Sequence, residues 1–296
     1  MRMHALTPST RSGRRWAGTL VAGFVAILAF GSPAARAQDP NAAAEQNRQE
    51  AIEIVKGMAK YVGGQTDISL AFDSELEVVT PQMEKLQFNS SGKASIHRPD
   101  EFRVSRTGGY ADVELLYDGK SVTVLDKNAN AYASEPMSGS MDSVVDKLRG
   151  DLMLDMPAAD LLIADSFNAL MADVVEAKHI GRAVIGGIAC EHVAFRNHDT
   201  DWQLWVETGA QPIPCKMVIT SKSVAGAPQY TIQFTDWHSG TQFPAGTFAF
   251  DPPANARKVD FSKLVDIDEV PASSATPTDM KSPNDTQSPP PSGASK

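Results

Sequence analysis

The stretch CEHVAFRNHDTDWQLWVE, residues 190–207, gathers the side chains of this chain that are best suited to chemistry. It contains a cysteine, two histidines, several carboxylates and two tryptophans. A zinc site needs three or four such ligands at close range. Cys190 and His192 are two residues apart, so a strand would place them on one face, and a nearby acid could complete a ligand set. A metal-dependent enzyme is therefore one alternative.

The alternation of residue types in the same stretch instead predicts a β-hairpin that forms part of a sheet. Val193 and Phe195 fall on the face opposite to Cys190 and His192, and residues 197–200 form a polar turn. His198 lies in that turn, so the two histidines do not converge. The chain also contains neither a G-x-S-x-G nor an H-E-x-x-H motif. The sequence predicts no catalytic residue, no metal ligand and no cofactor.

The two cysteines, Cys190 and Cys215, leave two alternatives open. An exported chain permits a disulfide bond. One predicted strand lies between them, which would separate the Cα atoms by about 10 Å, beyond bridging range. The loop at residues 211–214 could close that gap. The pair therefore forms either a disulfide or two buried free thiols.

The first 37 residues predict a secretory signal peptide. Arg11, Arg14 and Arg15 precede an apolar run over residues 16–30, and an A-x-A cleavage site ends at Ala37. The run is shorter than the roughly 20 residues that span a bilayer. We expect a periplasmic protein that is exported by either the Sec or the Tat route. Its signal peptide is expected to be cleaved near Ala37.

The charge of the mature chain argues against nucleic acid as a partner. Removing five signal-peptide arginines from the 27 basic residues leaves 22 against 36 acidic residues, a net charge of −14. Binding to nucleic acid requires a basic stripe. The same charge disfavours adsorption to anionic lipid surfaces.

Hydrophobic periodicity predicts a mainly β (α+β) fold. An amphipathic helix is expected over residues 38–65, followed by about six strands, two or three short helices within 138–173, and about five more strands. Residues 243–256 then close the domain, with Phe248 and Phe250 alternating. A strongly curved antiparallel sheet of about 11 strands would form an incomplete barrel. The N-terminal helix and the short helical insertion would cover it.

The domain organisation follows from the same pattern. Residues 38–264 form a single half-barrel domain, whereas residues 265–296 are rich in proline and serine and nearly lack apolar side chains. Such a segment cannot bury enough surface to offset its ordering entropy. We expect the tail at 265–296 to be disordered.

Several separated blocks resemble a family of predicted bacterial periplasmic proteins of unknown function. These blocks are the stretch at 190–207, QPIPCKMVIT, YTIQFTDWH and LLYDGKSVTVLDKNANAYA, and the resemblance extends over roughly residues 45–262. The family is similar to the lipoprotein carrier and receptor proteins LolA and LolB. This resemblance implies an incomplete antiparallel barrel that helices plug, with acyl chains sheltered between sheet and helices. It implies no catalytic residue.

The leading functional hypothesis is a periplasmic binding or carrier protein for an apolar ligand, such as a lipid or lipoprotein acyl chain. Each buried methylene contributes about 0.8 kcal/mol, so a long acyl chain gains about 10 kcal/mol gross. The alternatives are a non-enzymatic scaffold that docks on an envelope protein, or an interior that is packed solid. The predicted ligand-cavity lining is Val55, Met58, Leu70, Phe72, Leu76, Leu86, Phe88, Val113 and Leu115.

Overall fold

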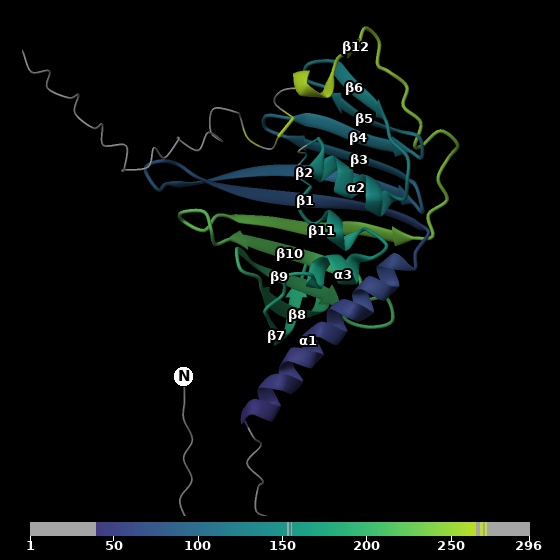
Figure 1. The fold of residues 1–296 in the computed structure, drawn as a ribbon. Coiled ribbons are helices and arrows are strands. Elements are labelled where there is room, and N and C mark those ends of the chain that lie inside the picture. The colour runs from purple at the N-terminus through teal and green to yellow at the C-terminus, as the bar shows by residue number, and fades with distance from the viewer. Residues whose placement is uncertain (1–39, 153, 155, 265–266, 269, 271–296) are drawn as a thin grey trace, which may run out of the picture. The chain divides into compact units, whose positions relative to one another are not determined.

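The computed structural model describes residues 40–152, 154, 156–264, 267–268 and 270. Within them, one 12-stranded sheet carries helices on one of its faces (Figure 1). The predicted signal peptide at 1–37 lies outside the described residues, as does nearly all of the predicted tail at 265–296. No helix in these ranges is long and apolar enough to cross a membrane.

The elements follow the predicted order of helix, strands, helices and strands. The first helix and the first six strands are α1 (Pro40–Gly63), β1 (Asp67–Val79), β2 (Lys85–His97), β3 (Glu101–Gly108), β4 (Asp112–Asp118), β5 (Ser121–Asp126) and β6 (Ala131–Pro136). The helical insertion contains α2 (Met141–Gly150), η1 (Ala159–Leu161) and α3 (Ser166–Met171). The remaining elements are β7 (Glu176–Ile185), β8 (Ile188–Arg196), β9 (Thr200–Glu207), β10 (Pro214–Ser221), β11 (Gln229–Ser239), β12 (Arg257–Lys258) and η2 (Phe261–Lys263).

The sheet is open, with the strand order β12-β6-β5-β4-β3-β2-β1-β11-β10-β9-β8-β7. Neighbouring strands pair antiparallel except the two-residue β12, which pairs parallel to β6. β1 joins the two halves because it pairs with both β2 and β11. The prediction of a curved antiparallel sheet under an N-terminal helix and a helical insertion is confirmed.

The two faces of the sheet differ in what covers them. We call the face under the helices the inner face; it carries Ile68, Leu70 and Phe72 of β1 and, in register with the first two, Ile96 and Ala94 of β2. These side chains form one buried core with α1, α2 and α3. The core therefore lies between the inner face and the helices.

α1 packs along one side because its apolar residues recur every three or four positions. Its buried residues are Ala51, Val55, Met58, Ala59 and Val62. That spacing places them on one helical stripe. The helix packs on β7 and α3, and more lightly on β8 and β9. It thus covers the β7–β9 part of the inner face.

Arg98, in the turn between β2 and β3, ties the end of α1 to the sheet. Its Nε donates to the Gln65 carbonyl at 3.0 Å, and its guanidinium also contacts the carbonyls of Val62 and Leu162. Carbonyls at a helix end lack partners within the helix. The arginine satisfies them and anchors the helical cover at this end of the strands.

Residues 240–256 close the domain without forming a strand, although Phe248 and Phe250 alternate. The segment runs over the outer face, where Phe248 contacts His97 and Phe250 contacts Tyr132. Prolines interrupt it at 244, 252 and 253, and proline cannot donate to a strand ladder. Alternation here reflects contacts with the outer face rather than strand pairing.

Candidate binding site at the open end of the inner face

The predicted cavity residues divide into two groups. Val55, Met58, Leu70 and Phe72 are 0–8% exposed and belong to the packed core under the helices. Leu115 is half-buried and packs against both buried clusters. The first group is thus already in contact with protein side chains.

The other group lies where the sheet extends beyond its helices. Leu76 and Phe88 are half-buried register partners, and Leu86 is 38% exposed. In Figure 1 the β1–β2 and β10–β11 hairpins reach past α2 and α3 on the left. These strands are long, 13 residues each for β1 and β2, whereas α2 has 10 residues.

We call this region the open end and define it by Leu76, Val78, Leu86, Phe88 and Tyr110. Leu76 and Val78 on β1 pair with Phe88 and Leu86 on β2. The Tyr110 ring, on the turn after β3, meets the Phe88 ring edge-on with centroids 5.6 Å apart. Tyr110 is 51% exposed. The open end is therefore a partly exposed apolar strip that continues the inner face. Val113, on β4, is also half-buried.

A polar cluster separates the packed core from the open end. It consists of Ser74, Arg106 and Tyr230, from β1, β3 and β11. The Tyr230 hydroxyl hydrogen-bonds Ser74, which is 1% exposed. Arg106 donates to the Ile267 carbonyl and interacts electrostatically with Tyr230 and Asp268. Three strands thus contribute to one polar cluster, in which Ser74 is buried and Arg106 and Tyr230 are half-buried.

Gly92 explains how large side chains fit around this cluster. It is the register partner of both Phe72 and Arg106. A Cβ at Gly92 would lie 2.2 Å from the Phe72 ring and 2.3 Å from the Ser105 carbonyl oxygen. The missing side chain lets the Phe72 ring lie over β2.

Burial governs the electrostatics of the cluster. It lowers the pKa of Arg106, whereas the nearby Tyr230 and Asp268 act in the opposite direction. It also raises the pKa of Tyr230, partly offset by the hydrogen bond with Ser74 and by Arg106. At neutral pH the cluster therefore presents a charged guanidinium and a neutral phenol.

The stretch at 190–207 forms the predicted hairpin, β8 and β9. His192 stacks on Trp205 with ring centroids 4.2 Å apart, and its Nε2 lies 3.0 Å from Gln203 Oε1. Burial lowers the pKa of His192. His198 lies in the turn between the strands. The described part of the chain holds no group of three His, Cys, Asp or Glu residues suited to a metal ion.

Cys190 and Cys215 lie closer than the predicted spacing allows. Both thiols are buried and unbonded, with their Sγ atoms 3.1 Å apart. The register of β9 and β10 shifts between Pro214 and Lys216, at Cys215 itself. This irregularity brings the sulfurs together across β9. Burial raises the pKa of both thiols. Whether they form a bond in the exported protein stays a prediction.

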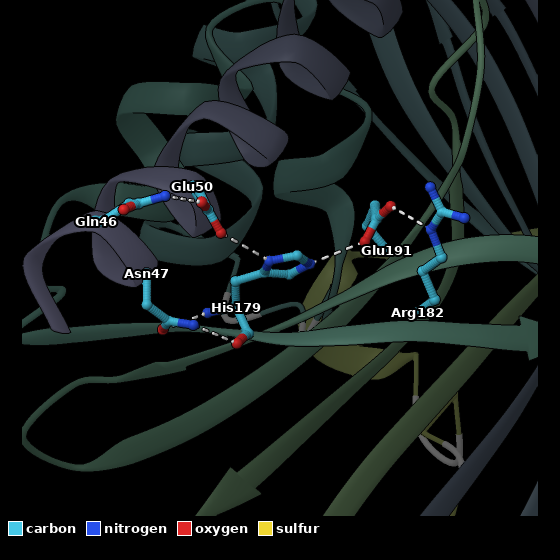
Figure 2. Close-up of polar contacts among 6 residues, drawn as sticks. All are labelled: Gln46, Asn47, Glu50, His179, Arg182 and Glu191. Atoms are coloured by element: carbon cyan, nitrogen blue, oxygen red, sulfur yellow. Dashed lines mark hydrogen bonds and ion pairs between the residues drawn. The ribbon is translucent and has the colours of Figure 1, made fainter. Parts of the chain in front are cut away.

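A second polar cluster fixes α1 to the edge strand β7 (Figure 2). The Asn47 amide pairs with the His179 backbone, donating to its carbonyl at 2.7 Å and accepting from its N–H at 3.0 Å. The His179 ring lies between Glu50, at 3.2 Å, and Glu191, at 2.8 Å. Hydrogen bonds with Gln46 and His179 lower the pKa of Glu50. These contacts hold the helix over its side of the inner face.

Two clefts lie elsewhere among the described residues. One, of about 680 Å³, is lined by Asp67, His97, Glu101, Asp118 and the segment 240–249. The other, of about 350 Å³, lies between the end of α2 and the chain after β12. Neither is lined by a predicted cavity residue. The smaller one includes Ile267 and Asp268, which are the neighbours of Arg106.

The family described as "Predicted periplasmic protein (DUF2092)" matches residues 51–262. The chain belongs to this family. A comparison with curated proteins gives no match.

Similar solved structures include three bacterial proteins. An uncharacterised conserved protein from Thermus thermophilus is 12% identical, with a TM-score of 0.42, 72% of this chain covered and 99% of the other. A chain in the MucA/MucB complex of Pseudomonas aeruginosa is 14% identical, with a TM-score of 0.41, 68% of this chain covered and 61% of the other. A LolA superfamily protein from Nitrosomonas europaea is 11% identical, with a TM-score of 0.34, 68% of this chain covered and 97% of the other.

Proposed function

We propose that this DUF2092 member is a periplasmic protein that binds an apolar ligand, such as a lipid or lipoprotein acyl chain, at the open end. One observation carries the proposal. The apolar alternation of the inner face continues beyond the helices, and there it is partly exposed, as Leu86 at 38% illustrates.

This proposal moves the ligand away from part of the predicted lining. Val55, Met58, Leu70 and Phe72 are already packed, so a ligand among them would have to displace α1 or α2. At the open end a chain would instead cover apolar surface that faces solvent. Covering such surface yields about 25 cal/mol per Å².

The test compares two apolar-to-serine changes at different exposed sites. Phe88→Ser removes the aromatic side chain at the centre of the open end. Val184→Ser is the control, since Val184 is 68% exposed on the edge strand β7, and four strands separate β7 from β1. Fluorescent fatty-acid titration should show binding by the wild type and by Val184→Ser. In Phe88→Ser the affinity should fall about tenfold, as expected for about 1.4 kcal/mol of lost apolar contact.

Two results would count against this location. One is undetectable fatty-acid binding by the folded wild type. The other is an equal loss of affinity in both variants, which would show that serine substitution acts without regard to site. Thermal midpoints measured in parallel identify any variant that loses its fold.

A second candidate function, docking of an envelope protein, is favoured by the β7 edge. Ile180 and Val184 on β7 are 54% and 68% exposed, and Ile188 at the start of β8 is 40% exposed. An edge strand offers unpaired backbone groups to which an extended partner segment can add a strand. Gly181, at a register shift, and the exposed Arg182 partly disrupt this edge.

Native mass spectrometry of the protein purified from the periplasm separates the two functions. A lipid adduct that is reduced in Phe88→Ser supports the carrier. A stoichiometric protein partner that is lost in Val184→Lys, while Phe88→Ser retains it, supports docking at β7 instead.

A further inference from the structure

Arg106 places a cation on a face whose neighbouring positions are apolar. Phe102 and Val104 precede it at two-residue steps on β3, so strand geometry puts all three on the inner face. Its register partners are Gly92 on β2 and Val113 on β4. Even partial burial of a guanidinium is costly unless oxygen acceptors surround it. The chain therefore places a group here that requires anionic or carbonyl oxygens.

The surroundings of Arg106 supply such oxygens at the margin of the open end. The Ile267 carbonyl accepts a hydrogen bond from its Nη2. Asp268 and Tyr230 interact electrostatically with the side chain. The Tyr230 hydroxyl provides a second polar group, held by Ser74. A cleft of about 350 Å³ is lined by Ile267 and Asp268, and its lining does not include Arg106 or Tyr230.

We infer that Arg106, assisted by Tyr230, binds the anionic head group of a single-chain amphiphile, a carboxylate or a phosphate, whose apolar chain lies along the open end. This inference rests on the proposed function and names the class of its ligand. The head group would replace the Ile267 carbonyl at the guanidinium. Carboxylates and phosphates can accept two parallel hydrogen bonds from arginine, and such charge-assisted bonds are stronger than neutral ones.

The length of the apolar strip agrees with this orientation. From Gly92, the register partner of Arg106, to Leu86 the strand extends about 20 Å at about 3.4 Å per residue. Half of a hydrocarbon bilayer core is about 15 Å. A chain of ordinary lipid length can therefore cover about three quarters of the distance from Gly92 to Leu86.

The acidic net charge of the chain does not oppose this contact. Charges at the protein surface are screened over about 8 Å at physiological ionic strength. The net negative charge therefore mainly opposes the approach of the protein to an extended anionic surface. At the polar cluster Arg106 supplies a positive charge, and Asp268 interacts with it electrostatically.

The experiment uses three ligands with the same chain and different heads: dodecanoate, dodecyl phosphate and dodecanol. At about pH 8 a carboxylate of ordinary pKa near 4.3 is fully charged. The variants are Arg106→Gln and Tyr230→Phe, with Lys93→Gln as the control for a cation on the exposed outer face of β2. Titration calorimetry measures the affinities, and circular dichroism checks the fold.

The wild type should bind at least one anionic ligand about tenfold or more tightly than dodecanol. Arg106→Gln should remove that preference and change dodecanol affinity less than twofold, and Tyr230→Phe should reduce the preference about threefold. Lys93→Gln should match the wild type. The ratio of dodecanoate to dodecyl phosphate affinity identifies which head group the site favours.

Equal wild-type affinities for all three ligands would overturn this inference while leaving the proposed function intact. Failure of all three to bind would overturn both. If Arg106→Gln does not fold, the wild-type preference and its reduction in Tyr230→Phe decide the matter. A preference that persists unchanged in Tyr230→Phe and folded Arg106→Gln would place the head group elsewhere.

Discussion

The two ends of β1 and β2 carry the same alternation but occupy different environments. Near the start of β1, Ile68 and its register partner Ile96 are at most 2% exposed beneath the helices. Farther along the same strands, Leu86 is 38% exposed and Phe88 is half-buried. The strands therefore determine which face is apolar, whereas the length and placement of the helices determine which part of that face is packed.

The largest expected difference between the ends is in stability. Phe72→Ser at the packed end should reduce the free energy of unfolding by about 3–5 kcal/mol, because it leaves a cavity and a hydroxyl in a packed core. Leu86→Ser at the open end should reduce it by less than about 1 kcal/mol. Urea denaturation followed by circular dichroism measures both. Equal destabilisation would show that the open end is also packed core.

The next effect concerns the anchor of the helical cover. Arg98→Met should destabilise the protein by about 2–3 kcal/mol, because carbonyls at the end of α1 lose a charged donor. Arg182→Met is the control, since its side chain is 86% exposed. The same denaturation measurement applies. An Arg98 variant as stable as the Arg182 variant would mean that the cover does not depend on this contact.

The smallest effect is a pH dependence of stability that comes from His97, at the packed end of β2. The hydrogen bond with Asp67 raises the pKa of His97, which partial burial opposes. The stabilisation is therefore complete below the unfolded value of about 6.5 and is lost as the pH rises through the folded value. His97→Asn should lower stability at about pH 5 by less than about 1 kcal/mol, because the side chain is 43% exposed.

A comparison of the variant with the wild type at two pH values tests this effect. At about pH 8.5, above the titration of the histidine, the His97→Asn variant should approach the wild type. A larger loss at pH 8.5 than at pH 5 would contradict the assigned sign.

The sequence predicted the architecture because its strongest signals are local. Two-residue alternation in β1 to β11 and helical spacing in α1 need no knowledge of distant contacts. The predicted helix over 38–65 matches α1, Pro40–Gly63, within two residues. Alternation is less informative at Phe248 and Phe250, where no strand forms, because it cannot report whether a ladder partner exists. The prolines at 252 and 253 carried that information.

The candidate site could be predicted only in part from the sequence. Leu76, Leu86 and Phe88 followed from alternation, but their exposure depends on where α2 and α3 end. Arg106 was overlooked although it continues the inner-face alternation of Phe102 and Val104. A charge in such a position is a recognisable signal. Tyr230 is far from Arg106 in the chain. Their interaction depends on the β1–β11 pairing, which no local pattern reveals.

The most direct test of the central claim locates the bound chain. Phe88→Trp places a fluorophore in the middle of the open end, and the native tryptophans are accounted for by the difference from the wild type. Titration with a fatty acid brominated in its chain should quench the added emission with the same saturation curve as dodecanoate binding. Saturable binding of that fatty acid without quenching of the added emission would place the ligand away from the open end and contradict the account.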